Sequence, residues 1–353
     1  MYKNRNLTFI ITFFSGVGTS FCFPSTVPFV ILDLDGEVDK MTRERIRIAC
    51  VVMLGIALVT GCGRKAAEVV LADEPVALAG SPALISNLAS VTASGSLQQR
   101  SGNGVIDYSN TCDGYVMVQY AGDTSKRLKT QVKGPSTTYT YNLTPGSWTT
   151  FPLSDGNGNY QVTVYENVVE SRYAAVVSAS FSVQLTDEFA PFLRPNQYVD
   201  YEAAPNTVAK AAELTAGMAD PLKKVEAVYD FVVRNLTYDT AKASSVTSGY
   251  LPVLDSVLVQ KTGICFDYAA LMAGMLRSQG VPCKLVVGYA GEIYHAWISV
   301  WTAENGWVDG VIYFDGNTWH RMDPTFASSN QQNNEAIAAY IGNGANYTTK
   351  YIY

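Results

Sequence analysis

The spacing of apolar and polar residues divides the chain into two patterned parts, which meet near residue 195. Between residues 105 and 185, apolar residues alternate with polar ones, and turns rich in Gly, Pro and Asn separate the alternating segments. We predict strands at 115–120, 127–133, 138–143, 148–153, 160–166, 173–177 and 179–185. Several short strands at close spacing indicate an all-β sandwich domain, which we place over 101–195.

After residue 200, apolar residues recur at every third or fourth position, as they do on the buried face of a helix. We predict helices over 207–218, 221–236 and 265–278, with Pro221 at the start of the second and Gly280 as the cap after the third. Buried-type strands are predicted at 284–289, 295–301 and 307–314, with a closing strand at 347–353, and 253–259 is a further short apolar segment. Helices followed by several strands indicate an α+β domain over 200–353, with helices packed on an antiparallel sheet.

The N-terminal residues have the pattern of a targeting segment. Residues 41–47 are basic, 48–59 are apolar, and the run ends in small residues before Cys62. Residues 41–61 fit a signal peptide, and the ending resembles a bacterial lipobox, whose cysteine is lipidated and becomes the first mature residue. The alternative is a transmembrane anchor, but the apolar run is shorter than the roughly 20 residues that a span needs.

These residues predict an extracytoplasmic lipoprotein that is anchored to the cell membrane through Cys62. Residues 62–100 are then a tether, and 1–61 form the targeting segment. A signal that begins at Met41 makes residues 1–40 unnecessary. Our hypothesis is that translation starts at Met41 and that 1–40 are not translated.

Composition supports a folded protein and argues against a nucleic-acid partner, a disulfide scaffold, a metal site and a cofactor. The hydrophobic fraction is 48% and the charged fraction 16%, which suits a globular chain. The net charge is −6 and the body of the chain has no Lys/Arg cluster, so we expect no nucleic-acid partner. The six cysteines are scattered and form no Cys-x-x-Cys pair, so we expect no disulfide scaffold, no metal site and no cofactor.

Three side chains carry the candidate chemistry. Cys265 follows a glycine turn at the predicted start of a helix, His295 begins a predicted strand, and Asp323 lies further along the chain. The N–H groups and dipole of a helix N-terminus stabilise a thiolate, and the same N–H groups can bind an oxyanion. An imidazole can take the thiol proton and a carboxylate can orient the imidazole. These residues are therefore candidates for nucleophile, base and orienting group.

Each candidate also has a plainer interpretation. A cysteine is often a buried small hydrophobe, which is the preferred interpretation of Cys283, and Asp323 before Pro324 could mark a turn. His320 is interpreted as an exposed strand or turn residue, Asp267 as a helix-start residue and Tyr268 as a packing residue. A metal site made of Cys265, His295 and Asp323 lacks a typical ligand cluster. A disulfide between Cys112 and Cys283 is left open.

Five sequence motifs resemble those of the transglutaminase-like superfamily. They lie at 229–239, 262–269, 276–282, 294–297 and 322–325, so that the resemblance covers about residues 205–330. It implies a papain-like core helix packed on an antiparallel sheet, with Cys265 as nucleophile, His295 as general base and acid, and Asp323 as the orienting carboxylate. It also implies acyl transfer through a thioester, which ends in hydrolysis, deamidation or an isopeptide crosslink. The superfamily includes crosslinkers, proteases and amidases, so the fold does not choose among these outcomes.

The expected function is that of a membrane-tethered thiol enzyme acting on amide bonds of proteins or peptides. The sandwich, which at about ninety residues has the size of an immunoglobulin-like (Ig-like) module, would be a spacer or would present the substrate. Trp148 and the tyrosines could contact carbohydrate or cell wall, although packing roles explain such aromatics more simply. The alternative is a non-catalytic binding or structural lipoprotein that uses the fold as a scaffold.

Overall fold

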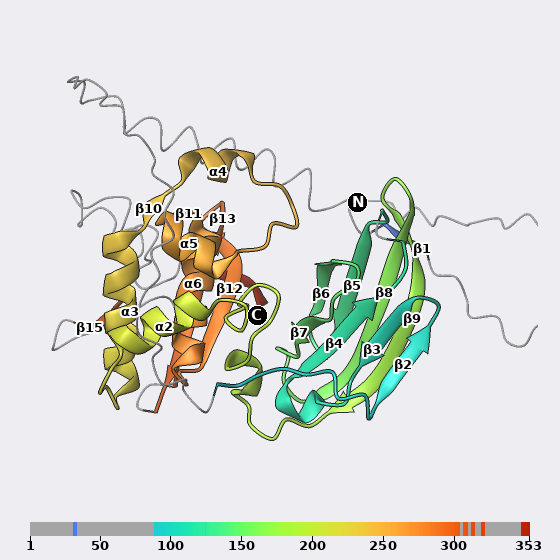
Figure 1. Cartoon of the computed structure of the whole chain (residues 1–353), viewed down its shortest axis with the longest axis horizontal. Helices are drawn as coiled ribbons and strands as arrows, with labels where there is room; N and C mark the ends of the chain where they lie inside the picture. Colours follow the sequence, from blue (N-terminus) through green and yellow to red (C-terminus); the bar gives the residue numbers. More distant parts are fainter. Residues whose placement is uncertain are drawn as a thin grey trace, which may run out of the picture.

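The computed structural model describes residues 31–33, 88–123, 125–303, 306–309, 312–314, 319–321 and 347–353. An all-β domain and a mixed domain of helices and sheet lie side by side in it (Figure 1). The predicted fold class, an α+β domain preceded by a β-sandwich, is confirmed.

The β-domain consists of two antiparallel sheets. Their strand orders are β1-β9-β8-β5-β6 and β2-β3-β4-β7. The strands of the first sheet are β1 (Ile31–Asp33), β5 (Leu128–Lys133), β6 (Thr138–Leu143), β8 (Gly158–Val169) and β9 (Arg172–Val183). Those of the second sheet are β2 (Gln98–Ser101), β3 (Gly104–Asp107), β4 (Tyr115–Tyr120) and β7 (Thr149–Pro152). Buried residues from both sheets, among them Val118, Phe151 and Val162, form the core between them.

Two features of the β-domain differ from the predicted strands. β9 is one continuous strand, whereas we predicted a break at residue 178. Ser178 stays in the strand because it is exposed there and its hydroxyl lies 2.8 Å from the Thr163 hydroxyl of β8. The hairpin of β2 and β3 was not predicted, and β2 begins inside the stretch assigned to the tether. The sequence of β2 is polar throughout, so it shows no alternation of apolar and polar residues.

The segments before the sandwich are described only in part. Cys62 and the predicted signal at 41–61 lie outside the described residues. β1, which falls within residues 1–40, pairs antiparallel with β9. In the second half of the predicted tether, Ala89 accepts a hydrogen bond from the Tyr201 hydroxyl at 2.9 Å. None of the helices within the described residues is both long enough and apolar enough to cross a membrane.

One buried helix organises the mixed domain. This helix, α6 (Cys265–Ser278), has the bounds that the sequence predicts, and all its residues from Asp267 onward are buried. It packs against helices α2, α3 and α5 and also against strands β12 and β13. The remaining helices are α2 (Pro205–Leu214), α3 (Pro221–Asn235), α4 (Thr240–Ser245) and α5 (Leu254–Gln260). Gly280 follows α6 with a φ of +75°, which suits its predicted role as a cap.

The main sheet of this domain is antiparallel, with the strand order β14-β13-β12-β17. Its strands are β12 (Cys283–Ala290), β13 (Ile293–Thr302), β14 (Gly306–Asp309) and β17 (Tyr347–Ile352). β17 pairs with β12, so the predicted return of the closing strand to the sheet is confirmed. The single strand predicted at 307–314 is wrong. β14 joins the main sheet, whereas β15 (Ile312–Phe314) pairs with β16 (Trp319–Arg321).

Tyrosine rings join the two domains. Tyr139 and Tyr141, on edge strand β6, each lie 5.7 Å from the Tyr353 ring centroid. Tyr353 in turn lies 4.7 Å from the ring centroid of Tyr198, in the segment that links the domains. We call Tyr139, Tyr141, Tyr198 and Tyr353 the tyrosine cluster. It extends to the start of α6, because the Tyr198 ring lies 5.3 Å from that of Phe266, the residue after Cys265.

Candidate active site

Cys265 is the first residue of α6, and the chain reaches it through a short parallel strand pair. β10 (Thr237–Tyr238) pairs with β11 (Thr262–Gly263), and Gly263 accepts the Asp239 N–H at 2.9 Å. The N-cap residue Ile264 is extended and has no polar side chain, so it cannot cap the helix itself. Asp267 supplies a partner instead by accepting the Ile264 N–H at 2.8 Å. Cys265 is half-buried, which leaves part of its surface open to solvent.

Gly263 leaves room for the Asp267 side chain to fold back toward the start of α6. A Cβ atom at this position would lie 2.6 Å from Asp267 Cβ, so a side chain and the folded-back aspartate cannot both fit. We expect Gly263→Ala to lower the free energy of unfolding by about 1–3 kcal/mol, because the start of α6 must shift. Chemical denaturation measures this change.

Gly274→Ala is the matched control for Gly263→Ala. An added Cβ there meets Leu254 Cδ1 at 2.5 Å, which is the movable end of a side chain rather than an atom next to the backbone. We expect a smaller loss of stability at Gly274 because Leu254 can turn away. An equal or larger loss in the Gly274 variant would contradict this account of Gly263.

His295 lies on β13, the strand that packs against α6. Only 5% of its surface is exposed, and its ring stacks on Trp297 with a centroid separation of 6.3 Å. Gly288 of β12 is its partner in the sheet register. A Cβ on Gly288 would lie 2.0 Å from the Thr348 carbonyl oxygen, so glycine at this position lets β17 approach the sheet opposite His295.

Tyr294 connects the surroundings of Cys265 and His295. Its side chain keeps 41% of its surface exposed, yet burial around the hydroxyl raises its pKa. Charges on neighbouring groups raise that pKa further, and Cys265 is one of these groups. Tyr294 directly precedes His295 on β13, the strand that packs against α6.

The third predicted member of the triad, Asp323, lies outside the described residues. The other histidine, His320, falls in β16, which pairs with β15 rather than with the main sheet. Sequence motif and structure thus bring the elements that carry Cys265 and His295 together, and the placement of Asp323 stays a prediction.

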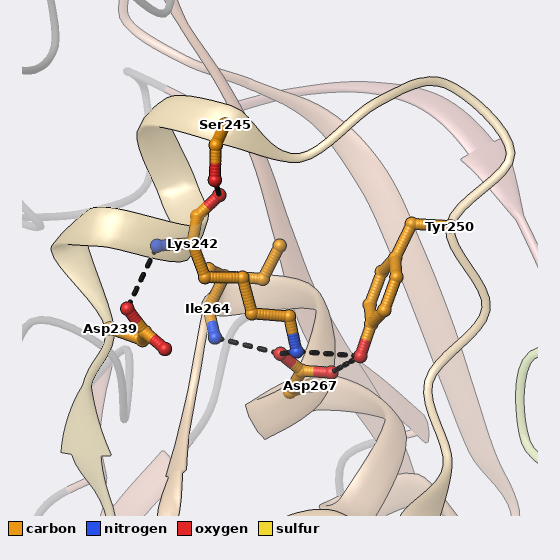
Figure 2. A network of polar contacts seen from close by, with 6 residues as sticks. All are labelled: Asp239, Lys242, Ser245, Tyr250, Ile264 and Asp267. Atoms are coloured by element: carbon orange, nitrogen blue, oxygen red, sulfur yellow. Dashed lines mark hydrogen bonds and ion pairs between the residues drawn. The ribbon is translucent and has the colours of Figure 1, made fainter.

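A polar network beneath the start of α6 was missed by the sequence reasoning. Figure 2 shows the Asp267 carboxylate at its centre. The Tyr250 hydroxyl donates to Oδ1 at 2.5 Å, and Lys242 Nζ donates to Oδ2 at 2.7 Å and to the Tyr250 oxygen at 2.6 Å. Asp267 has no exposed surface. Its predicted role as a helix-start residue is confirmed, but Lys242 and Tyr250 come from α4 and the following loop, which carry no motif.

Among the described residues, Cys112 lies at the surface, whereas Cys283 and Tyr268 are packed in the interior. Cys112 and Cys283 are both free thiols, so no disulfide joins them. Cys283 is fully buried, and burial raises the pKa of its thiol to about 12. Its interpretation as a small hydrophobe is confirmed, as is the packing role of Tyr268, which is also fully buried.

Part of the mixed domain matches a known protein family. Residues 208–324 match the family model described as the transglutaminase-like superfamily. YebA of Bacillus subtilis, an uncharacterized protein, is 30% identical over 117 residues, which are 28% of this chain and 16% of that protein. The protein-glutamine gamma-glutamyltransferase of Pseudomonas aeruginosa is 25% identical over 158 residues, 40% of this chain and 21% of that protein. The alignments therefore span only about a sixth to a fifth of these relatives.

A solved structure gives a more distant likeness. The periplasmic domain of TgpA from Pseudomonas aeruginosa, bound to ethylmercury, is 20% identical, with a TM-score of 0.29. The match covers 65% of this chain and 75% of that one. The region that matches the family model contains α6 with Cys265 and β13 with His295. Residues 208–324 of this chain are a domain of the transglutaminase-like superfamily.

Proposed function

We propose that this protein is a thiol enzyme that acts on amide bonds of proteins or peptides. Cys265 is the nucleophile, His295 the general base and acid, and Asp323 the group that orients His295. One observation carries the proposal: a half-buried cysteine begins the central helix, and the strand that packs on this helix carries a buried histidine. Nucleophilic catalysis by cysteine requires a thiol stabilised at a helix start and an imidazole that can take its proton, and these two elements carry those groups.

The first half of the reaction forms a thioester. His295 takes the Cys265 proton, and the sulfur attacks the carbonyl carbon of the amide. N–H groups at the start of α6 stabilise the oxyanion that develops on the carbonyl. The C–N bond then breaks, and the nitrogen leaves as ammonia or an amine with the proton from His295.

The second half releases the acyl group and restores the thiol. Attack by water gives a carboxylic acid, which is hydrolysis of a peptide bond or deamidation of a side chain. Attack by a lysine amine gives an isopeptide crosslink. The Pseudomonas aeruginosa relative is named a protein-glutamine gamma-glutamyltransferase, and this name supports including the crosslinking branch.

The setting that we propose is outside the cytoplasmic membrane, with the enzyme tethered through a lipid on Cys62. The basic start, the apolar run and the small residues before Cys62 support this location. A carbohydrate or cell-wall contact is proposed for the sandwich. A cavity of about 280 Å³ lies where the sandwich meets the segment that follows it, and it is lined by Trp148 of the sandwich and by Asp200 of that segment, whose pKa is raised by burial.

A single experiment separates the branches. The purified protein is incubated with peptides that contain glutamine and lysine, with and without a small primary amine, and the products are read by mass spectrometry. Cleavage, deamidation and crosslinking give different mass changes. Equal product formation by a Cys265→Ala variant would overturn the proposal and would favour the non-catalytic scaffold.

His295→Gln is expected to lower turnover by about 10²–10⁴-fold, because an amide cannot move the thiol proton. The same variant is expected to slow alkylation of Cys265 at neutral pH. His320→Gln is the matched control, since it removes the other histidine, which lies on β16, and it should retain activity. An unchanged rate in the His295 variant, or equal losses in both variants, would remove His295 from the mechanism.

A further inference from the structure

Two negative charges compete for one helix end in the proposed mechanism. The Cys265 thiolate and the Asp267 carboxylate both lie in the first turn of α6, and the positive end of the helix dipole stabilises both. Asp267 has no exposed surface, so water screens its charge poorly. A carboxylate without a compensating cation would destabilise a neighbouring thiolate, because like charges repel each other.

The Asp267 carboxylate accepts hydrogen bonds from two donors that are not cationic side chains. Ile264 donates its N–H to Oδ2 at 2.8 Å, and the Tyr250 hydroxyl donates to Oδ1 at 2.5 Å. Neither of these two donors is an ammonium or guanidinium group, so their hydrogen bonds do not neutralise a carboxylate. Compensation must therefore come from a cation, and Lys242 Nζ lies 2.7 Å from Oδ2 (Figure 2).

We propose that Lys242 is a positioning residue for the nucleophile: its ammonium neutralises the Asp267 carboxylate and leaves the positive helix end to the Cys265 thiolate. The inference rests on the proposed use of Cys265 as a nucleophile. Lys242 does not touch the reacting atoms and acts through Asp267.

The fold brings Lys242 to this position by a short path. Asp239 directly follows β10, the partner strand of β11, and its carboxylate accepts the Lys242 N–H at 2.8 Å to begin α4. The Lys242 ammonium then lies 4.3 Å from the Tyr250 ring centroid. Partial burial lowers the pKa of Lys242, but the bonds to Asp267 and Tyr250 outweigh burial and raise it overall. Lys242 is therefore charged at neutral pH.

The other titratable groups near Cys265 do not replace this cation. Tyr250 is neutral at pH 7, because burial and the bond to Asp267 raise its pKa. Tyr294 is also neutral there, since burial raises its pKa. His295 on β13 can carry a positive charge, but the proposed mechanism uses it as the base. Lys242 is the group whose charge is directed at Asp267 throughout the reaction.

The test is the pH dependence of Cys265 alkylation by iodoacetamide, followed by mass spectrometry of the peptide that contains Cys265. In the wild type we expect faster alkylation at pH 6 than that of a free cysteine peptide. In Lys242→Met we expect the rate at pH 6 to fall about tenfold, because the uncompensated Asp267 carboxylate repels the thiolate that reacts with iodoacetamide. The plateau rate at high pH should be unchanged, which a merely structural role would not produce.

Two further variants test the route through Asp267. Lys242→Arg keeps the charge and should keep the wild-type profile. Lys242→Met combined with Asp267→Asn removes both charges and should return the rate at pH 6 to within about threefold of the wild type. If the double variant reacted at pH 6 as slowly as Lys242→Met, Lys242 would not act through Asp267, and the inference would be overturned.

Lys210→Met is the matched control. The Lys210 side chain is 32% exposed, against 29% for Lys242, and it too pairs with a carboxylate, that of Glu213. Its profile should equal that of the wild type. A wild-type alkylation rate at pH 6 no faster than that of the free cysteine peptide would overturn the proposed function. A faster rate that is the same in the wild type and in Lys242→Met would overturn only the role of Lys242.

Discussion

Replacing Cys265 with alanine is expected to abolish amide turnover, with a loss of at least about a thousandfold. Without the sulfur no thioester can form, and the remaining oxyanion donors leave only weak residual catalysis. The fold should persist, because Cys265 is half-buried at the first position of α6 and alanine is a good helix former. Product formation is measured by mass spectrometry, and thermal unfolding confirms that the variant is folded.

Cys112→Ser is the control for Cys265→Ala. Cys112 is an exposed free thiol in the β-domain, so it reports what loss of a reactive but uninvolved thiol does. We expect full turnover in this variant. If the Cys112 variant lost activity and the Cys265 variant kept it, the active site would have to be sought outside α6.

The second large effect is expected at Arg277, near the end of α6. Arg277 is buried, and its guanidinium donates to the backbone oxygens of Cys283 at 2.8 Å, Arg194 at 2.9 Å and Tyr353 at 2.6 Å. It therefore ties α6 to β12, to the segment between the domains and to the end of β17. We expect Arg277→Met to lower the free energy of unfolding by about 3–5 kcal/mol, because three backbone oxygens lose a charged donor.

The matched control for Arg277→Met is Arg234→Met on α3. The Arg234 side chain is 73% exposed and pairs with Asp230 one helical turn away, so we expect a change of less than about 1 kcal/mol. Arg277→Lys should fall between the two, since an ammonium cannot span all three oxygens. Urea denaturation measures all three variants. Similar values for Arg277→Met and Arg234→Met would show that the three bonds contribute little.

The parts of the fold that were predictable are those with strong local signals. The helix at 265–278 is apolar along most of its length and lies between Gly263 and Gly280, so both ends are marked. The segment 253–259 forms most of α5, where Leu254 and Val257 are buried at a helical spacing of three, but so short a run is ambiguous by periodicity alone. The sequence at the end of β14 contains Asp309-Gly310, a dipeptide typical of turns inside an apolar run, and this signal could have divided the predicted strand.

In the candidate site, residues within sequence motifs could be predicted, whereas residues brought in by the tertiary fold could not. Cys265 and His295 could be named because each lies in a recognisable motif, and the structure places their elements against each other. Lys242 and Tyr250 could not be named, because their relation to Asp267 depends on how α4 and its loop fold back over the start of α6. A lysine and a tyrosine in a polar stretch have no periodic or motif signal that would set them apart.

The tyrosine cluster bears on how a substrate could reach Cys265. Tyr353 packs on Tyr139 and Tyr141 of the sandwich, while its backbone pairs with Leu285 of β12. The sandwich and the main sheet of the mixed domain thus share one packed interior and do not swing on a free linker. A polypeptide held on the sandwich would meet Cys265 at a constant separation, so its effective concentration at the thiol is set by the architecture and not by diffusion.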